Sequence, residues 1–321
     1  MTLGHPQILK LYRLRPCNSQ CDVIQGVRVS FPCIPLRFIL ATGSLFHAKG
    51  IRVPIAPISD TEFAKFRQFI FEFAGISMAD AKKALVTGRL SKRLSLYELE
   101  TFGDYFNLLS TGKHPDEVQM AVDLLTTNET YFFREIKHFE FLRTHALKER
   151  SRVQPFRIWS AASSSGEEAY SMAMVLADCM QTTPWEILGT DISTRVLEGA
   201  RRSLYSMERG RHIPQAYLKR FCRKGTGQHE GYLLIERSLR SKVSFRQVNL
   251  NAALPELGQF DVIFLRNVMI YFNNDTKRQV VARVIENIKP GGYFCVGHSE
   301  SLNDITQAVQ MVAPAIYKKG N

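Results

Sequence analysis

Segments typical of strands and helices alternate over the second half of this chain, and that alternation limits its possible folds. "FRIWSAA" is a short apolar run typical of a buried strand, and "GEEAYSMAMVLADCM" after it has the length of a helix. The pattern repeats in "WEILGTDI" with "STRVLEGARRSLY", and in "FDVIFLRNVMIYF" with "NDTKRQVVARVIENI". "YFCVGHSE" and "AVQMVAPAIYKK" follow as a strand and a last strand or hairpin. The sequence therefore predicts an α/β domain over residues 156–321, with a mostly parallel sheet and helices on both faces.

The residues before this domain have helical periodicity instead. Ser59 and Glu62 form a capping-box pattern, apolar residues then recur at helical spacing, and Gly75 ends the first helix. "DAKKALVTGRLSKRLSLY" and "TFGDYFNLLST" supply two more helices. We therefore expect a small all-helical domain over 56–125. Its second helix is basic without an intervening acid, which is typical of a solvated face or of an acidic docking surface: Lys82, Lys83, Arg89, Lys92 and Arg93.

The totals fit two domains and an acidic partner. The chain has 321 residues, and 42 basic against 30 acidic residues give a net charge of +12. Neither a zinc-finger spacing nor an RNA-binding strand motif is present, so we expect neither nucleic-acid binding nor a metal site. The scattered cysteines favour reduced thiols and a cytoplasmic location. Residues 1–55 are rich in proline and break their apolar run with Arg28 and Arg37, which predicts a disordered extension rather than a membrane span.

The loop "SAASSSGEEAY" after the first strand of the sheet indicates a ligand. Its small residues let a ligand approach the backbone where the next helix begins, although it is not the G-x-G-x-x-G dinucleotide fingerprint. Glu167 and Glu168 would repel a pyrophosphate, so the loop favours a ligand with an ammonium and a sulfonium group. The alternative is that both glutamates only complement the helix dipole.

Polar residues at the ends of later strands fit the same ligand. Asp191 ends the second strand, 25 residues after Gly166, where an acid holds a ribose diol in Rossmann-like sheets. Asn249 and Asn267 stand where an adenine would lie, although a lone Asn is often only a turn former. "IKPGG" predicts a sharp turn from helix to strand. Together these features predict S-adenosylmethionine as cofactor and methyl transfer as the reaction.

Motifs in one order carry a family resemblance. "TTNETYFFRE", "IWSAASSSGEEAYSMAM", "GTDIS", "YLKRFC", "GTGQHEG", "VNL", "FDVIFLRNVMIYF", "KPGG" and "GHSE" succeed one another between about Ser59 and Lys318. This part of the chain resembles the CheR family of chemotaxis receptor methyltransferases, which are protein-glutamate O-methyltransferases. The resemblance implies a Rossmann-like S-adenosylmethionine methyltransferase domain with a small helical N-terminal domain and a small antiparallel β insertion at about 216–243.

The resemblance also implies roles for individual residues. Arg134 is expected to orient the substrate carboxylate as well as to touch the cofactor, and Tyr271 to line the path of the methyl group. His298 and Glu300 of "GHSE" are interpreted as loop structure. The implied cofactor-binding residues are Asn128, Thr130, Arg134, Glu168, Asp191, Asn249, Leu250, Arg266 and Asn267.

The segment "TNETYFFRE" is then the joint between the two domains. We expect its aromatic residues to anchor the joint in apolar packing and its polar residues to point into the cofactor cleft. Residues 126–155 are accordingly predicted to be a linker helix that contributes to the cofactor site.

The implied substrate is a glutamate on the signalling helices of methyl-accepting chemotaxis receptors. That carboxylate is already ionised at neutral pH, so a one-step displacement needs no general base. Docking is expected at Arg89, Lys92 and Arg93, and at the β insertion with Gly225, Gly227 and Gly231, which would pair with a receptor's C-terminal pentapeptide. The protein is expected to be a monomer that does not insert into a membrane. The alternatives are a non-catalytic receptor adaptor that binds the cofactor, and a methyltransferase for RNA or a small molecule.

Overall fold

The computed structural model describes residues 55–144, 148, 154–180 and 183–321. The predicted extension, apart from residue 55, lies outside these residues. All described residues belong to one unit, Ile51–Asn321. No helix in the described part of the chain has both the length and the apolar character needed to cross a membrane.

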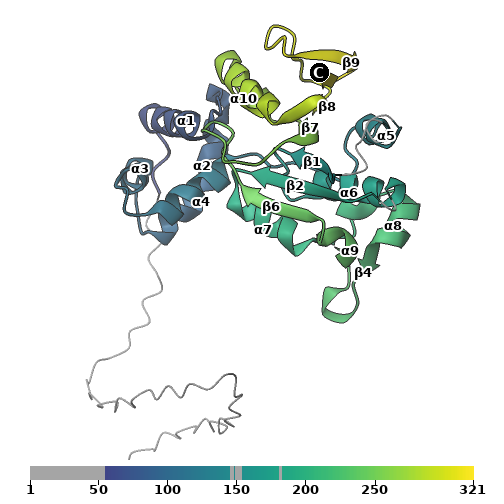
Figure 1. Cartoon of the computed structure of the whole chain (residues 1–321). Helices are drawn as coiled ribbons and strands as arrows, with labels where there is room; N and C mark the ends of the chain where they lie inside the picture. Colours follow the sequence, from purple (N-terminus) through teal and green to yellow (C-terminus); the bar gives the residue numbers. More distant parts are fainter. Residues whose placement is uncertain (1–54, 145–147, 149–153, 181–182) are drawn as a thin grey trace, which may run out of the picture. The chain divides into compact units, whose positions relative to one another are not determined.

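The N-terminal part is the predicted helical domain (Figure 1). Ser59 caps the first helix with the full capping box to Glu62, and Gly75 ends it at a φ of 72°. A fourth helix, which the sequence analysis did not separate, begins with Pro115 in its first turn. Phe66, Leu90 and Tyr105 are fully buried between the helices. The elements are α1 (Asp60–Ala74), η1 (Asp80–Lys82), α2 (Lys83–Leu96), α3 (Phe102–Ser110) and α4 (Pro115–Leu125).

The C-terminal part contains a seven-stranded sheet in the order β6-β2-β1-β7-β8-β10-β9. The first five strands of that order are parallel, and β10 and β9 form an antiparallel hairpin at one edge. The predicted mostly parallel sheet is thus confirmed. Its strands are β1 (Phe156–Ser160), β2 (Trp185–Asp191), β6 (Val243–Gln247), β7 (Phe260–Leu265), β8 (Ile288–Val296), β9 (Val309–Ala313) and β10 (Ile316–Lys319).

Successive residues of the strands enter two different cores, because side chains alternate across a sheet. Ile158 packs with α6 (Glu167–Cys179) and α5 (Lys137–Thr144) on one face. Trp159, the next residue, packs on the other face with α10 (Asn274–Glu286). α7 (Thr194–Arg202) contacts β2 and β6. The helices thus cover both faces and leave the carboxyl ends of the parallel strands free to carry a site.

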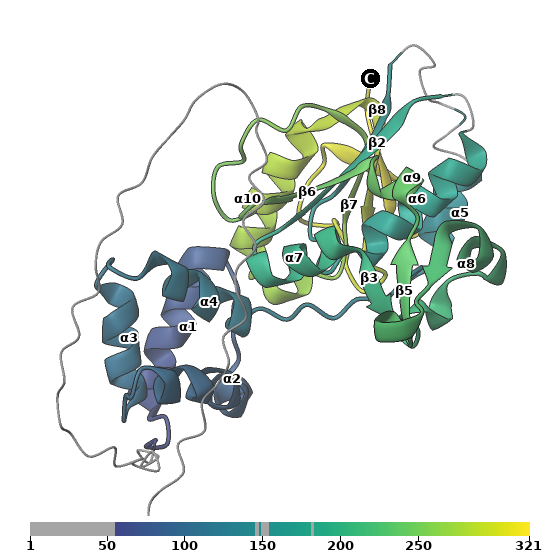
Figure 2. The ribbon, with the colours of Figure 1, turned by 90° about the horizontal axis from the view of Figure 1, so that it is seen from below.

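A second sheet, antiparallel in the order β3-β5-β4, corresponds to the predicted β insertion (Figure 2). It differs from the prediction because its first strand comes from residues that we expected to be helical. α7 ends at Arg202, Ser203 turns the chain at a φ of 51°, and β3 then pairs with β5. The elements of this region are β3 (Leu204–Ser206), η3 (Arg209–His212), α8 (Gln215–Phe221), β4 (Cys222–Lys224), η4 (Gly227–His229), β5 (Tyr232–Ile235) and α9 (Arg237–Arg240).

Two further expectations are corrected. The "KPGG" residues do not precede the strand, because β8 begins at Ile288; they lie where its register against β7 shifts, and Gly291 has a φ of 71°. The linker is not one helix either. Within its described residues, only 137–144 form an α-helix (α5), and 126–136 form an irregular segment with positive φ at Phe133 and Glu135.

Hydrogen bonds join the helical domain to the sheet domain at several points. Asp123 at the end of α4 accepts hydrogen bonds from the backbone N–H groups of Thr194 and Arg195 at 3.0 and 3.1 Å, which caps α7. The Asn249 amide donates to the carbonyl of Phe73 at 2.6 Å. These contacts fix α1 and α4 beside the carboxyl ends of the strands.

Candidate active site

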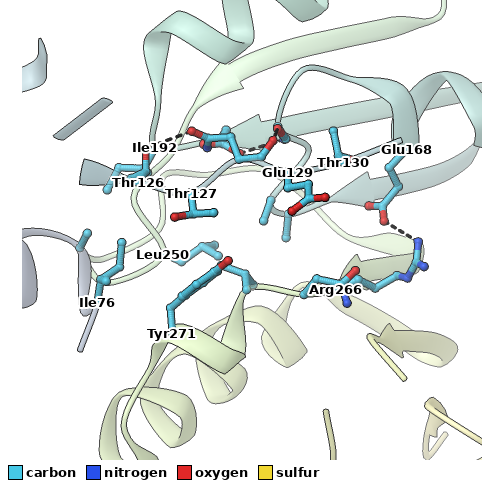
Figure 3. Close-up of a pocket in the computed structure, with 18 of the residues that line it drawn as sticks. Ile76, Thr126, Thr127, Glu129, Thr130, Glu168, Ile192, Leu250, Arg266 and Tyr271 are labelled. Carbon is cyan, nitrogen blue, oxygen red and sulfur yellow. Dashed lines mark hydrogen bonds and ion pairs between the residues drawn. The ribbon is translucent and has the colours of Figure 1, made fainter. Parts of the chain in front are cut away.

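A cavity opens at the carboxyl ends of β1, β2, β6 and β7 (Figure 3). The strand order reverses between β1 and β7, and ligands of doubly wound sheets bind at such a switch point. The cavity encloses about 920 Å³ of empty space, open solvent included, which is in the range of small-molecule sites. Ala74 and Ile76 of the helical domain form part of its wall, so both domains contribute to it.

Every residue predicted to bind the cofactor or to act in the reaction lines this one cavity. They come from the 126–134 segment, from the first turn of α6 and from the ends of β2, β6 and β7. The set is Asn128, Thr130, Arg134, Glu168, Asp191, Asn249, Leu250, Arg266, Asn267 and Tyr271.

Asp191 lies at the end of β2 with its carboxylate almost fully buried. It accepts hydrogen bonds from the backbone N–H groups of Ser164 and Ser193, both at 2.9 Å. Burial outweighs these two bonds and raises the pKa of Asp191 to about 6. Its remaining lone pairs are available to the two hydroxyls of a ribose.

The two glutamates that begin α6 have different surroundings. Glu168 accepts hydrogen bonds from Ser160 Oγ and from Arg266 Nη1, each at 2.7 Å, at the edge of the cavity (Figure 3). Glu167 is fully buried on the other side and forms an ion pair with Arg209. Burial raises the pKa of Glu167. Of these two glutamates, only Glu168 therefore lines the cavity.

Arg266 is the buried cation that connects the cavity walls. Besides Glu168, its Nη2 lies 3.0 Å from Glu135 Oε2 and donates to the carbonyl of Arg134 at 2.5 Å. Burial opposes the charge of Arg266, but Glu168 and Glu135 outweigh it, so its pKa is raised. No role was predicted for Glu135, although it ends the most distinctive motif of the chain.

Glu300 holds the loop after β7 in place. Its carboxylate accepts hydrogen bonds from the backbone N–H groups of Asn267, Met269 and Gly297 at 2.8, 2.7 and 2.7 Å. Asn267 has a φ of 56°, a strained value for a residue other than glycine. The structural role predicted for Glu300 is confirmed, and its bonds fix the loop that presents Tyr271.

Arg134 and Tyr271 approach the cavity from two separate segments of the chain. Arg134 is half-buried, and its guanidinium donates to the carbonyl of Glu129 at 3.1 Å and lies 5.7 Å from the ring centroid of Tyr131. Tyr271 points into the cavity from the loop after β7, across from Thr127 and Glu129 (Figure 3). Both side chains thus line the same cavity.

Beside Arg266, the side chains of Glu135, His138 and His298 come close enough to hold a metal ion, with one ligand atom of each within 4.8 Å of the others. The Glu135 carboxylate is already neutralised by Arg266. Burial, followed by the charge of Arg266, lowers the pKa of His138 to about 3. A cation so close to the ligand atoms opposes a second one, so the group fits an ion-pair network better than a metal centre.

The predicted docking arginines have partners inside the helical domain. Arg89 Nη1 donates to the carbonyls of Leu124 and Thr126 at 3.1 and 2.9 Å, which caps the end of α4. Arg93 Nε donates to the buried Glu117 carboxylate at 2.8 Å. Lys92 is exposed. Two of the three residues predicted for docking are thus engaged within the helical domain, and among the three only Lys92 is exposed.

The glycines of the β insertion shape the turn between β4 and β5. Gly227 and Gly231 have φ values of 57° and 83°, and a Cβ at Gly225 would lie 1.9 Å from the carbonyl oxygen of His229. They allow a tight turn beside the three-residue edge strand β4. The structure therefore leaves β4 as an edge to which a further strand could add.

The side chains that line the cavity fit S-adenosylmethionine. Asp191 suits the ribose, Glu168 suits the ammonium group, and the apolar side chains of Ile76, Val248 and Leu250 suit an adenine face. The strand order of the sheet, the cavity at its switch point and the side chains that line this cavity define a Rossmann-like S-adenosylmethionine-dependent methyltransferase.

Family comparisons give a more specific assignment. The family model described as "CheR methyltransferase, SAM binding domain" matches residues 128–317, and "CheR methyltransferase, all-alpha domain" matches residues 61–126. The chain belongs to the CheR methyltransferase family, and S-adenosylmethionine is its cofactor.

Curated relatives agree with this assignment. The chemotaxis protein methyltransferase of Escherichia coli K12 is 41% identical over 263 residues, covering 81% of this chain and 91% of the relative. Chemotaxis protein methyltransferase 2 of Pseudomonas aeruginosa is 40% identical over 259 residues, covering 80% and 92%. An O-methyltransferase family protein of Burkholderia thailandensis, among solved structures, has a TM-score of 0.33 and 16% identity over 62% of this chain and 46% of that one, which is too low to support an argument.

Proposed function

We propose that this protein methylates glutamate side chains of chemoreceptors to give glutamyl methyl esters, as part of sensory adaptation. The observation that supports the proposal most directly is one cavity lined by Arg134 and Tyr271 together with the cofactor-binding set around Asp191 and Glu168. The names of the curated relatives place those proteins in chemotaxis.

A glutamate acceptor suits this cavity because it needs little chemical activation. Its unperturbed pKa is about 4.3, so it is already a nucleophilic carboxylate at neutral pH. The protein then has to bring the two reacting atoms to about 3–3.5 Å and to exclude water. Bound S-adenosylmethionine supplies an electrophilic methyl group on its sulfonium.

Arg134 and Tyr271 have distinct proposed roles. One Nη1 hydrogen bond fixes Arg134 to the carbonyl of Glu129, and its other N–H groups remain to orient the acceptor carboxylate. Tyr271 would confine the path of the methyl group from the opposite wall. Glu300 acts through the loop by holding the backbone on which Tyr271 is carried.

Docking of the receptor is proposed at two surfaces. The exposed amines of Lys82 and Lys92 suit the acidic signalling helices of a receptor. The short edge strand β4, beside Gly225, Gly227 and Gly231, suits strand addition by a C-terminal receptor peptide. We propose that the protein works in the cytoplasm as a monomer.

The proposal is tested by transfer of a radiolabelled methyl group from S-adenosylmethionine to chemoreceptor-containing membranes, followed by mild alkali. We expect label on the receptor that alkali releases as methanol, and little label with Arg134→Ala. Near wild-type turnover of Arg134→Ala would contradict its orienting role.

The same experiment separates the alternatives. If S-adenosylhomocysteine binds but the receptor gains no label, the protein is a cofactor-binding adaptor. If the label is stable to alkali or appears on added RNA, the acceptor is not a glutamate.

A further inference from the structure

A second cavity lies on the far side of the cofactor loop, and arginines dominate its lining. It is formed by α6, α7, α9 and β6, and shares no lining residue with the cofactor cavity. Its lining residues are Tyr170, Arg201, Arg237, Arg240, Ser241, Val243 and Phe245. We propose that this arginine cavity binds the phosphate groups of a nucleotide, at a site separate from S-adenosylmethionine.

The arginines of this cavity lack an ion-pair partner within the described residues. No carboxylate lines it, and none of Arg201, Arg237 and Arg240 forms an ion pair in that part of the chain. Glu236, which precedes Arg237, is bound instead to Arg223 at 2.7 Å. Three like charges around one opening repel one another, and an anion between them removes that repulsion.

The hydrogen-bonding capacity of the arginines is also largely unused. Arg240 Nε is buried and lacks a hydrogen-bond partner within the described residues, an arrangement that is rare for a buried donor. Arg201 uses one N–H to reach the carbonyl of Phe245 at 3.1 Å, which holds its guanidinium at the rim. Guanidinium groups match phosphate oxygens with paired hydrogen bonds, and the Ser241 hydroxyl adds a further donor.

The remaining wall is apolar and aromatic, which favours an anion that carries an organic body. Phe245 is half-buried and packs at 5.7 Å, ring centroid to centroid, against Tyr170. Its ring also closes the space behind Gly166, where a Cβ would lie 3.1 Å from Phe245 Cζ. Free phosphate would leave this wall unused, whereas a nucleoside would cover Phe245 and Val243.

The test is calorimetric titration of ADP into the full chain saturated with S-adenosylhomocysteine, without Mg²⁺. Prior saturation matters because the adenosine part of ADP would otherwise bind the cofactor cavity. We expect ADP to bind the saturated protein, and Arg237→Gln and Arg240→Gln each to weaken it about fivefold or more. Arg278→Gln removes an exposed charge on α10 that lines neither cavity, and should leave ADP affinity within about twofold.

Titrations with two further ligands identify which part of ADP is recognised. Pyrophosphate should bind about tenfold more weakly than ADP, and adenosine should not bind measurably. Pyrophosphate binding as tight as ADP binding would overturn the nucleotide assignment in favour of an inorganic anion. The whole proposal fails if saturated protein does not bind ADP, or if Arg237→Gln and Arg240→Gln behave like Arg278→Gln. Unchanged affinity for S-adenosylhomocysteine in the variants shows that they remain folded.

Discussion

The protonation of Asp191 is expected to be coupled to the binding of the cofactor. Its free carboxyl has a pKa of about 6 because burial outweighs two backbone hydrogen bonds. Ribose hydroxyls donate to the ionised form, so binding lowers this pKa and releases protons near pH 6. Below pH 6, the carboxyl must first lose its proton, and the affinity for S-adenosylhomocysteine should fall by up to about tenfold per pH unit. Calorimetry in buffers of different ionisation enthalpy, at pH 6 and pH 8, measures the proton release directly.

Asp191→Asn is the control for this prediction. It keeps the size of the side chain but cannot titrate, so binding should be weaker and should lose its pH dependence between pH 5 and 7. Proton release that persists in Asp191→Asn would assign the titration to another group.

Glu135 is expected to position Arg266. Glu135→Gln removes one of the two carboxylates that hold the buried guanidinium, and a charge-assisted hydrogen bond contributes about 1.5–3 kcal/mol. We expect the dissociation constant of S-adenosylhomocysteine to rise about tenfold, because Arg266 then interacts more strongly with Glu168, whose carboxylate is less available to the ligand. Glu140→Gln, at an exposed position on α5, should leave that constant unchanged. A lower melting temperature with unaltered binding would mean that Glu135 has only a structural role.

At the scale of elements, Glu117 holds three helices together. It lies on α4, is buried, and accepts hydrogen bonds from Arg93 of α2, from Tyr105 of α3 and from Tyr97 at the end of α2. Burial opposes its charge, but these partners outweigh burial and lower its pKa. Glu117→Gln leaves Arg93 without a counter-ion and should lower the free energy of unfolding by about 3 kcal/mol. Chemical denaturation measures this loss, and Asp116→Asn, at an exposed position beside it, is the matched control.

The pH dependence of this contact has a definite sign. The pKa of Glu117 is lower in the folded than in the unfolded protein. Its contribution to the free energy of unfolding is therefore present above the unfolded pKa and is lost as pH falls through the folded pKa. The difference in stability between wild type and Glu117→Gln should therefore shrink in acid. A constant difference down to pH 3 would contradict the proposed ion pair.

Elements whose stabilising contacts lie close together in the sequence were predicted well, and elements that depend on distant residues were not. The capping box at Ser59 involves residues three apart and was predicted in detail, as were the side chains at strand ends. β3 was missed because Leu204 and Tyr205 continue a helical pattern and become a strand only by pairing with β5, which lies far along the chain. Arg93 was interpreted as a surface charge because nothing in its own helix reveals the buried Glu117.

At the scale of the whole molecule, the site depends on contacts between the helical domain and the sheet domain. α1 ends at the cavity, where Ser77 donates to the carbonyl of Tyr271 at 2.8 Å and Ile76 pairs with Phe272. Asp123 fixes the other end of the joint at α7. Among the residues that the structure describes, the lining of the site therefore begins at Ala74, in the helical domain.

This dependence leads to a prediction about the first 54 residues. The family models match residues 61–126 and 128–317, and the described residues that line the cavity lie between 74 and 272. A variant that begins at residue 55 should therefore bind S-adenosylhomocysteine, and methylate receptor membranes, within about twofold of the full chain. A variant that begins at residue 101 removes α1 and α2 and is the matched comparison. It should lose cofactor affinity, because Ile76, the Asn249 contact to Phe73 and the Arg89 cap are all absent. Loss of binding on removal of the first 54 residues alone would show that they contribute to the working protein.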